Sequence, residues 1–287
     1  MTDAERLTRG FVLSIQESPF RIAPERAEAL VAQIGRSAWS LDIVEGPVNF
    51  EAFPNDKKIE GTYSALLSLW AVAASIRLLL ALMQTAAQIG LEQVVIVPGG
   101  AGSEAIALKN AALALIRDHT YAWNEAPSEP DANAVFCSED GLTNNLFLAA
   151  ASFVVLHECG HLAQNHLVHT AHRHQQEFDA DRWAVAWTLD KVADENHRQF
   201  RMLAISVAFI WIGLIDEVRK TTATHPPAAQ RFSNAFTQFG ETGEDSLAFE
   251  ISSYAIKAFF NPTTNLPQSE NARDALVEQL IRYSRRE

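Results

Sequence analysis

The residues best suited to chemistry form the pentapeptide His157-Glu158-Cys159-Gly160-His161. Residues four apart lie on one face of a helix, so the imidazoles of His157 and His161 can converge on one metal ion. Zinc accepts such a pair of nitrogen ligands. Glu158 lies beside the pair and can reach a water molecule at the metal without binding the metal, as a general base must. The motif therefore predicts a hydrolytic site with one zinc ion per chain.

A catalytic zinc needs a third protein ligand and an open position for water. We expect Glu177 to be this ligand, because it opens a second amphipathic stretch, Glu177-Phe178-Asp179-Ala180-Asp181. Asp181, one turn later, is placed to accept a hydrogen bond from a zinc-bound imidazole and so to fix its tautomer. The alternative third ligands are the histidines between the two motifs, His166, His169, His172 and His174.

Each of these residues also has a purely structural explanation. His157, Glu158 and His161 would then be polar groups on an apolar helix, each needing a buried partner. Acidic residues near a helix start, such as Glu177, complement the helix dipole without binding anything. Cys137 and Cys159 form no disulfide framework, and close packing behind the site explains Cys159.

The order of these motifs resembles a known family. HECGH, then EFDAD, then His225-Pro226-Pro227 followed by Arg231, is similar to the HExxH…ExxAD…HPP pattern of gluzincin peptidases, which the CAAX prenyl protease and HtpX group shares. The resemblance implies that His225 helps to stabilise the oxyanion and that Arg231 holds His225 or the substrate in position. The alternative for His225-Pro226-Pro227 is a cap on the next helix, with proline in its first turn.

The resemblance extends to a segment before the active-site helix. Asn133, Ala134, Val135 and Phe136 are similar to the family's Asn-Ala-Phe strand at the edge of the cleft, which implies that they bind substrate. A peptide would then lie extended along residues 134–138 by strand addition.

The polar segment between the two metal motifs is too short and too polar to hold a membrane span. A smaller, soluble gluzincin is implied, similar in layout to phage-exclusion peptidases of the Lit type. That resemblance implies a regulated cytoplasmic protease, silent until phage infection, that cuts a translation elongation factor and has an activating peptide as a further partner.

Composition is compatible with this interpretation. The chain has 287 residues, 48% of them apolar, enough for one large domain or two small ones. A net charge of −12 argues against a nucleic-acid-binding face. Residues 64–83 are long and apolar enough to span a bilayer, but they include Arg77. We expect a buried core helix there, with a membrane association left open.

Periodicity predicts a mainly α protein with a small β-sheet (α+β): a zincin-like catalytic core with an active-site helix and an edge strand. The boundary at residues 126–133 would separate an N-terminal helical region, 1–130, from a metallopeptidase core, 131–287. Strands are expected at residues 41–44, 93–97 and 134–137. Helices are expected at residues 24–39, 63–89, 104–119, 143–166, 177–192, 198–219, 228–239, 247–260 and 272–283.

These observations favour a zinc-dependent endopeptidase that acts on a protein or peptide. Two alternatives remain at this point. One is a zinc-stabilised sensor or interaction protein without catalysis, in which Cys137 or a histidine of the connecting segment supplies a fourth ligand. The other is a zinc hydrolase of a non-peptide substrate, which the same chemistry permits.

Overall fold

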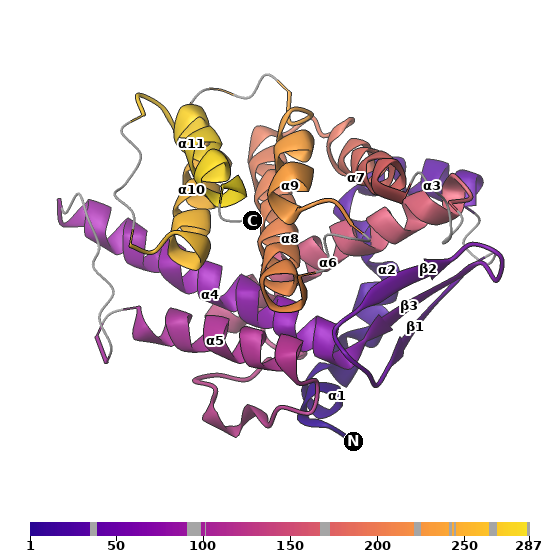
Figure 1. The fold of residues 1–287 in the computed structure, drawn as a ribbon, viewed down its shortest axis with the longest axis horizontal. Coiled ribbons are helices and arrows are strands. Elements are labelled where there is room, and N and C mark those ends of the chain that lie inside the picture. The colour runs from indigo at the N-terminus through magenta and orange to yellow at the C-terminus, as the bar shows by residue number, and fades with distance from the viewer. Residues whose placement is uncertain are drawn as a thin grey trace.

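The fold is seen in a computed structural model, which describes residues 1–34, 39–90, 99–100, 102–166, 173–220, 225–240, 243, 245–263 and 269–285. Helices dominate these ranges and a small sheet lies at one side (Figure 1), so the predicted fold class is confirmed. The strand expected at residues 93–97 lies outside the described residues. The α-helices are α1 (Asp3–Thr8), α2 (Val12–Ile22), α3 (Ala27–Ile34), α4 (Tyr63–Gln88), α5 (Ser103–Arg117), α6 (Glu139–Ala163), α7 (Arg173–Leu189), α8 (Glu195–Arg219), α9 (Ala228–Phe236), α10 (Leu247–Phe260) and α11 (Ala272–Ser284).

The sheet has three strands, β1 (Ser40–Val44), β2 (Phe50–Phe53) and β3 (Lys58–Thr62). β3 is central, with β1 parallel and β2 antiparallel to it. Figure 1 shows β2 on the side of the sheet nearest α6, which it contacts. Sequence analysis found β1 but missed β2 and β3, which are short and carry charged residues. The turn residues between them, Pro54-Asn55-Asp56, were the available signal.

The strand expected at residues 134–137 is wrong. The segment forms turns, in which the Ala134 amide donates to the Asp131 carbonyl and the Ser138 amide to the Val135 carbonyl. Ser138 then caps α6 by accepting a hydrogen bond from the Gly141 amide at 3.1 Å. Local turn and cap hydrogen bonds therefore outweigh the β-branched and aromatic character of the segment.

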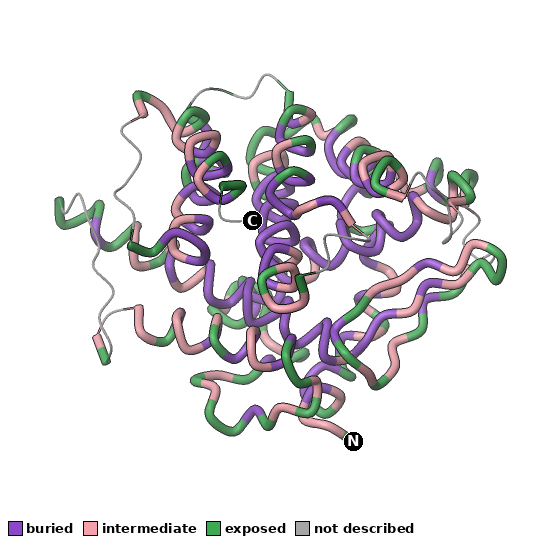
Figure 2. Tube along the Cα trace, viewed as in Figure 1, coloured by how far each residue is buried: buried purple, intermediate pink, exposed green. Residues whose placement is uncertain are grey.

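One continuous cluster of buried apolar side chains runs from α1 to α11. Figure 2 shows it as the purple stretches where α4, α6 and α8 cross the middle of the protein. α6, which carries the pentapeptide, packs against α2, α4, α7 and α8. Residues on both sides of position 130 contribute to this core, and the domain boundary proposed there stays a prediction.

α4 and α6 are long and apolar enough to cross a membrane by length and composition alone, a test that core helices of soluble proteins also pass. Most of the apolar window of each is buried inside the protein. Arg77, the charged residue within the apolar part of α4, donates to Thr143 Oγ1 at 2.7 Å and pairs with Glu139, both at the start of α6. Its charge is therefore balanced within the fold.

A close approach of α6 and α7 positions the candidate metal ligands. A Cβ atom added at Gly160 would lie 3.2 Å from Ala180 Cα and 3.3 Å from the Ala180 carbonyl oxygen. A larger residue at Gly160 would therefore push the two helices apart. Cys159, its neighbour, is fully buried in the core. Cys159 and Gly160 thus serve helix packing, and the other three residues of the motif are available for chemistry.

Candidate metal centre and active site

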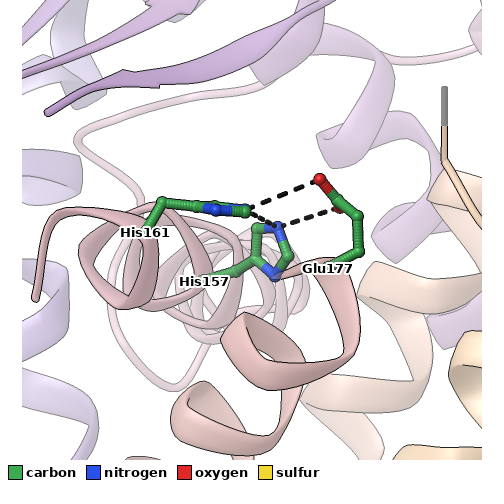
Figure 3. Close-up of side chains that lie close together, drawn as sticks. All are labelled: His157, His161 and Glu177. Atoms are coloured by element: carbon green, nitrogen blue, oxygen red, sulfur yellow. Dashed lines mark hydrogen bonds and ion pairs between the residues drawn. The ribbon is translucent and has the colours of Figure 1, made fainter. Parts of the chain in front are cut away.

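Two histidines of α6 and one glutamate of α7 come together in the structure (Figure 3). His157 Nε2 and His161 Nε2 lie 3.1 Å apart. Glu177 Oε2 is 3.4 Å from His157 Nε2, and Glu177 Oε1 is 3.6 Å from His161 Nε2. Figure 3 shows both imidazoles and the carboxylate turned toward one another. Each histidine thus faces a different oxygen of the Glu177 carboxylate, and the three side chains form a triangle around one possible metal position.

The size of this triangle suits a metal ion. Ligand atoms that bind a tetrahedral zinc ion at about 2.0–2.2 Å lie roughly 3.3–3.6 Å from one another. The two imidazole nitrogens lie 3.1 Å apart, and each lies 3.4 or 3.6 Å from the Glu177 oxygen that it faces. Two imidazoles and one carboxylate are also the donor set of many hydrolytic metal sites, which keep a fourth position open. His157, His161 and Glu177 can therefore hold a metal ion without rearrangement of the helices.

Asp181 lies behind the triangle and is almost fully buried. Its Oδ1 is 2.9 Å from His157 Nδ1, so the other nitrogen of this imidazole, Nε2, faces the centre. Arg231 of α9 donates to both oxygens of the same carboxylate, from Nε at 2.8 Å and from Nη2 at 2.7 Å. Its Nη1 also pairs with Glu177 Oε2 at 3.3 Å. Arg231 therefore links the candidate ligand Glu177 to the carboxylate that orients His157.

His161 has an outer partner of its own. His166, just beyond the end of α6, places its Nδ1 3.0 Å from His161 Nδ1. Asn165 takes a left-handed conformation with φ of 52°, which turns the chain back toward the helix. Sequence analysis weighed His166 as an alternative third ligand, whereas the structure places it behind His161. Both histidines of the pair thus present Nε2 to the centre and bind outer partners through Nδ1.

The remaining alternative ligands do not join the triangle in the part of the chain that the structure describes. His169 and His172 lie outside the described residues, and His174 is exposed on α7. Cys137, considered as a fourth ligand, is exposed in the turn before α6 and does not line the cavity described below.

The protonation of the two histidines is linked. Burial alone would lower the pKa of His157, but the charge and hydrogen bond of Asp181 raise it to about 10. Burial and the nearby charge of His157 lower the pKa of His161 to about 3. Without metal, His157 is therefore positively charged and His161 is neutral, and a metal ion would replace the extra proton on His157.

Glu158 is buried beside the triangle and lines the same cavity. Burial raises the pKa of its carboxyl group to about 7, and the negative charge of Glu177 acts in the same direction. A carboxyl group with a pKa near neutrality can both accept and release a proton. Glu177 and Asp181 differ, because the charge of Arg231 holds their pKa values low despite burial.

His225 and Arg231 occupy different positions relative to the centre. His225 Nε2 lies 3.6 Å from Glu177 Oε1, and its side chain is 37% exposed. Arg231 is only 6% exposed and faces the carboxylates. His225 therefore stands at the open side of the site, while Arg231 holds the buried carboxylates from the inner wall of the cavity described below. The Ala228 amide at the start of α9 is bound by Asp216 of α8, at 2.9 Å.

A cavity of about 370 Å³ opens in front of the triangle. Its walls come from β2, α6, α7, α8 and the start of α9, and His157, Glu158, Glu177 and His225 all line it. β2 contributes Phe50, Glu51 and Ala52. The strand beside the site is thus β2, which sequence analysis missed.

Asn133, Ala134, Val135 and Phe136, expected to bind substrate, do not line this cavity. Val135 and Phe136 are 74% and 71% exposed on the turn before α6. The turn packs against Gly141, whose added Cβ would meet the Val135 carbonyl oxygen at 2.0 Å. This tight packing holds the segment at the start of α6, several helical turns from the pentapeptide.

The fold and the site together define a helical protein with a metal-binding triangle and an adjacent buried carboxyl group. The family model of peptidase U49 matches residues 59–252, more than half of the chain, so the chain belongs to the peptidase U49 family and is a peptidase. The matched part contains the whole triangle and starts after β2. No curated protein and no solved structure matches the chain significantly.

The contact of Asp181 with both His157 and Arg231 yields a first prediction. Asp181→Asn removes the charge that orients the imidazole, so zinc affinity should fall roughly 10–100-fold. Competition with a chromogenic chelator measures this. Asp179→Asn, a matched change at a partly exposed position of α7 that contacts Gln175 and Arg182, should keep the parental affinity. Equal affinity in both variants would show that Asp181 does not support metal binding.

The extra proton on His157 yields a second prediction. At pH 8 the metal-free protein keeps a proton on His157, so zinc binding should release about one proton per chain. Below the pKa of about 10, affinity should therefore fall as the pH falls. Calorimetry in two buffers of different ionisation enthalpy counts the protons. Asp181→Asn should release fewer, and the absence of any release from the parent protein would contradict this assignment.

Proposed function

We propose that this peptidase is a zinc-dependent endopeptidase. The observation that carries the proposal is the triangle of His157, His161 and Glu177, open to a cavity beside the buried Glu158. Membership of a peptidase family supplies the reaction class. When bound, zinc would polarise the scissile carbonyl group and increase the acidity of a water molecule.

Glu158 is assigned the proton transfers. Its carboxylate takes a proton from the attacking water and later passes it to the nitrogen of the leaving amine. The raised pKa of Glu158 suits both steps, because a group with a pKa near 7 accepts and releases protons at neutral pH.

His225 is assigned the role of stabilising the negative charge that develops on the carbonyl oxygen. It lies on the cavity side of Glu177 and keeps part of its ring exposed. Burial lowers its pKa, so near neutral pH a neutral ring donates the hydrogen bond through one of its nitrogens. A donor directed at such an oxyanion commonly contributes a few kcal/mol, on the order of 2–4 kcal/mol.

The substrate is assigned to the outer edge of β2. β2 is the last strand in the sheet order, and within the described ranges no strand pairs with its outer edge. An extended peptide can add to such an edge through main-chain hydrogen bonds, which hold any sequence in line with the reacting groups. Since β2 lines the cavity, a peptide there would pass in front of Glu158. An available edge strand favours a peptide over a non-peptide substrate.

A closed structural metal site fits the observations less well. Such a site needs four protein ligands, whereas the group found among the described residues has three. The position facing the cavity is left for water or substrate.

Substitution of two glutamates tests the proposal. Glu158→Gln should keep one zinc per chain while cleavage falls by about 10²–10⁴-fold, because the proton acceptor is lost. Glu177→Ala should lose the metal as well. The measurements are zinc content and new N-termini in a denatured bacterial extract, detected by mass spectrometry.

Glu104→Gln, an exposed change on α5, is the matched control and should behave as the parent. Unchanged cleavage by Glu158→Gln would show that Glu158 is not the general base. Parental zinc binding by Glu177→Ala would show that the third ligand is a different residue.

We further propose that the peptidase acts in the cytoplasm and is restrained until an activating peptide appears during phage infection. The support is the resemblance to phage-exclusion peptidases, together with membership of the U49 family. Bacteria that produce the parent protein should then grow normally and plate a sensitive phage poorly, whereas those producing Glu158→Gln should plate it fully. Equal plating of a panel of phages on both strains would reject this role.

A further inference from the structure

α8 lines the cavity with a face whose side chains change from apolar to charged along the helix. Ile212, Ile215, Asp216 and Arg219 follow one another at helical spacing, so they lie on one side of the helix. All four line the cavity and are partly exposed. Along this face the cavity wall therefore changes from apolar to charged.

The apolar part of the wall is continuous with α6. Phe153 and Val154, one helical turn before His157, line the cavity together with the two isoleucines. Trp211 closes the space between α8 and β2, because its ring meets the ring of Phe50 edge to face at 6.4 Å. This arrangement forms a subsite for a large apolar side chain next to the metal triangle.

The charged part of the wall contains the carboxylate of Asp216, which already accepts a hydrogen bond within the fold. Asp216 Oδ2 accepts the Ala228 amide hydrogen at the start of α9. It also contributes to the high pKa of Arg231, deeper in the site. Asp216 therefore stabilises the fold on the inner side of the wall and forms no ion pair with Arg219.

Arg219 differs from most of the other arginines that are partly or fully removed from water. Arg198 donates to the carbonyl oxygens of Leu189 and Phe239. Arg26, Arg77, Arg201 and Arg231 each pair with a carboxylate. Arg219 is half-buried, and burial lowers its pKa. Among the residues that the structure describes, it has neither an ion pair nor a side-chain hydrogen bond. Arg173, at the start of α7, lines the same cavity and is likewise without a carboxylate partner within the described ranges.

A half-buried guanidinium group loses part of its hydration, and a hydrogen-bonding anion can replace it. Its planar row of donors matches a carboxylate in a two-bond arrangement. The cavity thus offers a site for a carboxylate at Arg219 beside a site for an apolar side chain at Ile212 and Ile215.

We infer that the cavity selects polypeptides in which an acidic side chain lies two residues from a large apolar one. The helical rise places the Arg219 backbone about 6–10 Å along α8 from Ile215 and Ile212. In an extended chain, side chains two residues apart point to the same face at about 6.6–6.8 Å. This inference rests on the proposed endopeptidase function, because it assumes an extended peptide beside β2.

Binding to the zinc-loaded Glu158→Gln protein tests the inference without requiring cleavage. The probes are fluorescent heptapeptides Ala-X-Ala-Leu-Ala-X-Ala, with X as Asp, Asn or Lys. They carry the variable residue on both sides of leucine, so the direction of the bound chain does not matter. Fluorescence anisotropy measures their affinities.

The Asp peptide should bind about tenfold more tightly than the Asn peptide, as expected for hydrogen bonds to a charged partner, and the Lys peptide should bind most weakly. Added Arg219→Gln should remove most of the preference for Asp over Asn. Added Arg219→Glu should reverse the order in favour of Lys. Arg182→Gln, an exposed change on α7 outside the cavity, should leave the order unchanged.

Equal binding of the three peptides, or a preference for Asp that survives Arg219→Glu, would overturn the inference. Cleavage by the parent protein separates the two proposals. An acidic preference in binding without any Glu158-dependent cleavage would support the inference and reject the endopeptidase. Glu158-dependent cleavage without an acidic preference in binding would do the reverse.

Discussion

The structure of the site depends on the balance of charge around one buried guanidinium group. Arg231 binds both oxygens of Asp181 and also pairs with Glu177, and all three side chains are almost inaccessible to water. Two carboxylates at such depth are tolerated only with compensating cations and full hydrogen bonding. Arg231 supplies part of this compensation, and His157 or a metal ion supplies the rest. Three helices, α6, α7 and α9, must therefore keep their relative positions for the site to exist.

The helix packing meets this requirement through small residues. Gly160 lies against Ala180, which allows α6 and α7 to approach closely enough for Glu177 to reach the histidines. Asp216 binds the start of α9 and so fixes the helix that carries Arg231. The rigid core thus orients the candidate metal ligands, while the partly exposed side chains of His225, Ile212 and Arg219 line the cavity.

Sequence analysis erred or was incomplete for segments that lie far from the pentapeptide in the sequence or whose contacts form only on folding. The strand at the cavity is β2, whose short and charged sequence hides its pattern, and the segment at residues 134–137 is a turn. Arg231 was expected to hold His225 or the substrate, which stays a prediction, and its ion pairs with two buried carboxylates were not foreseen. His166 was considered as a ligand, and it lies behind His161. In each case the partner depends on contacts between elements far apart in the chain.

The sequence alone determined what local geometry controls. The spacing of His157 and His161 on one helix, the adjacent Glu158, and the spacing of Glu177 and Asp181 on the next helix follow from 3.6 residues per turn. The mainly helical fold follows from the same periodicity. Only the tertiary structure decided which strand borders the cavity, which cation balances the buried carboxylates, and that Arg219 faces the cavity without a carboxylate partner among the described residues. These features depend on how helices and strands pack. The role of a buried or half-buried charge depends on the neighbouring groups, which come together only on folding.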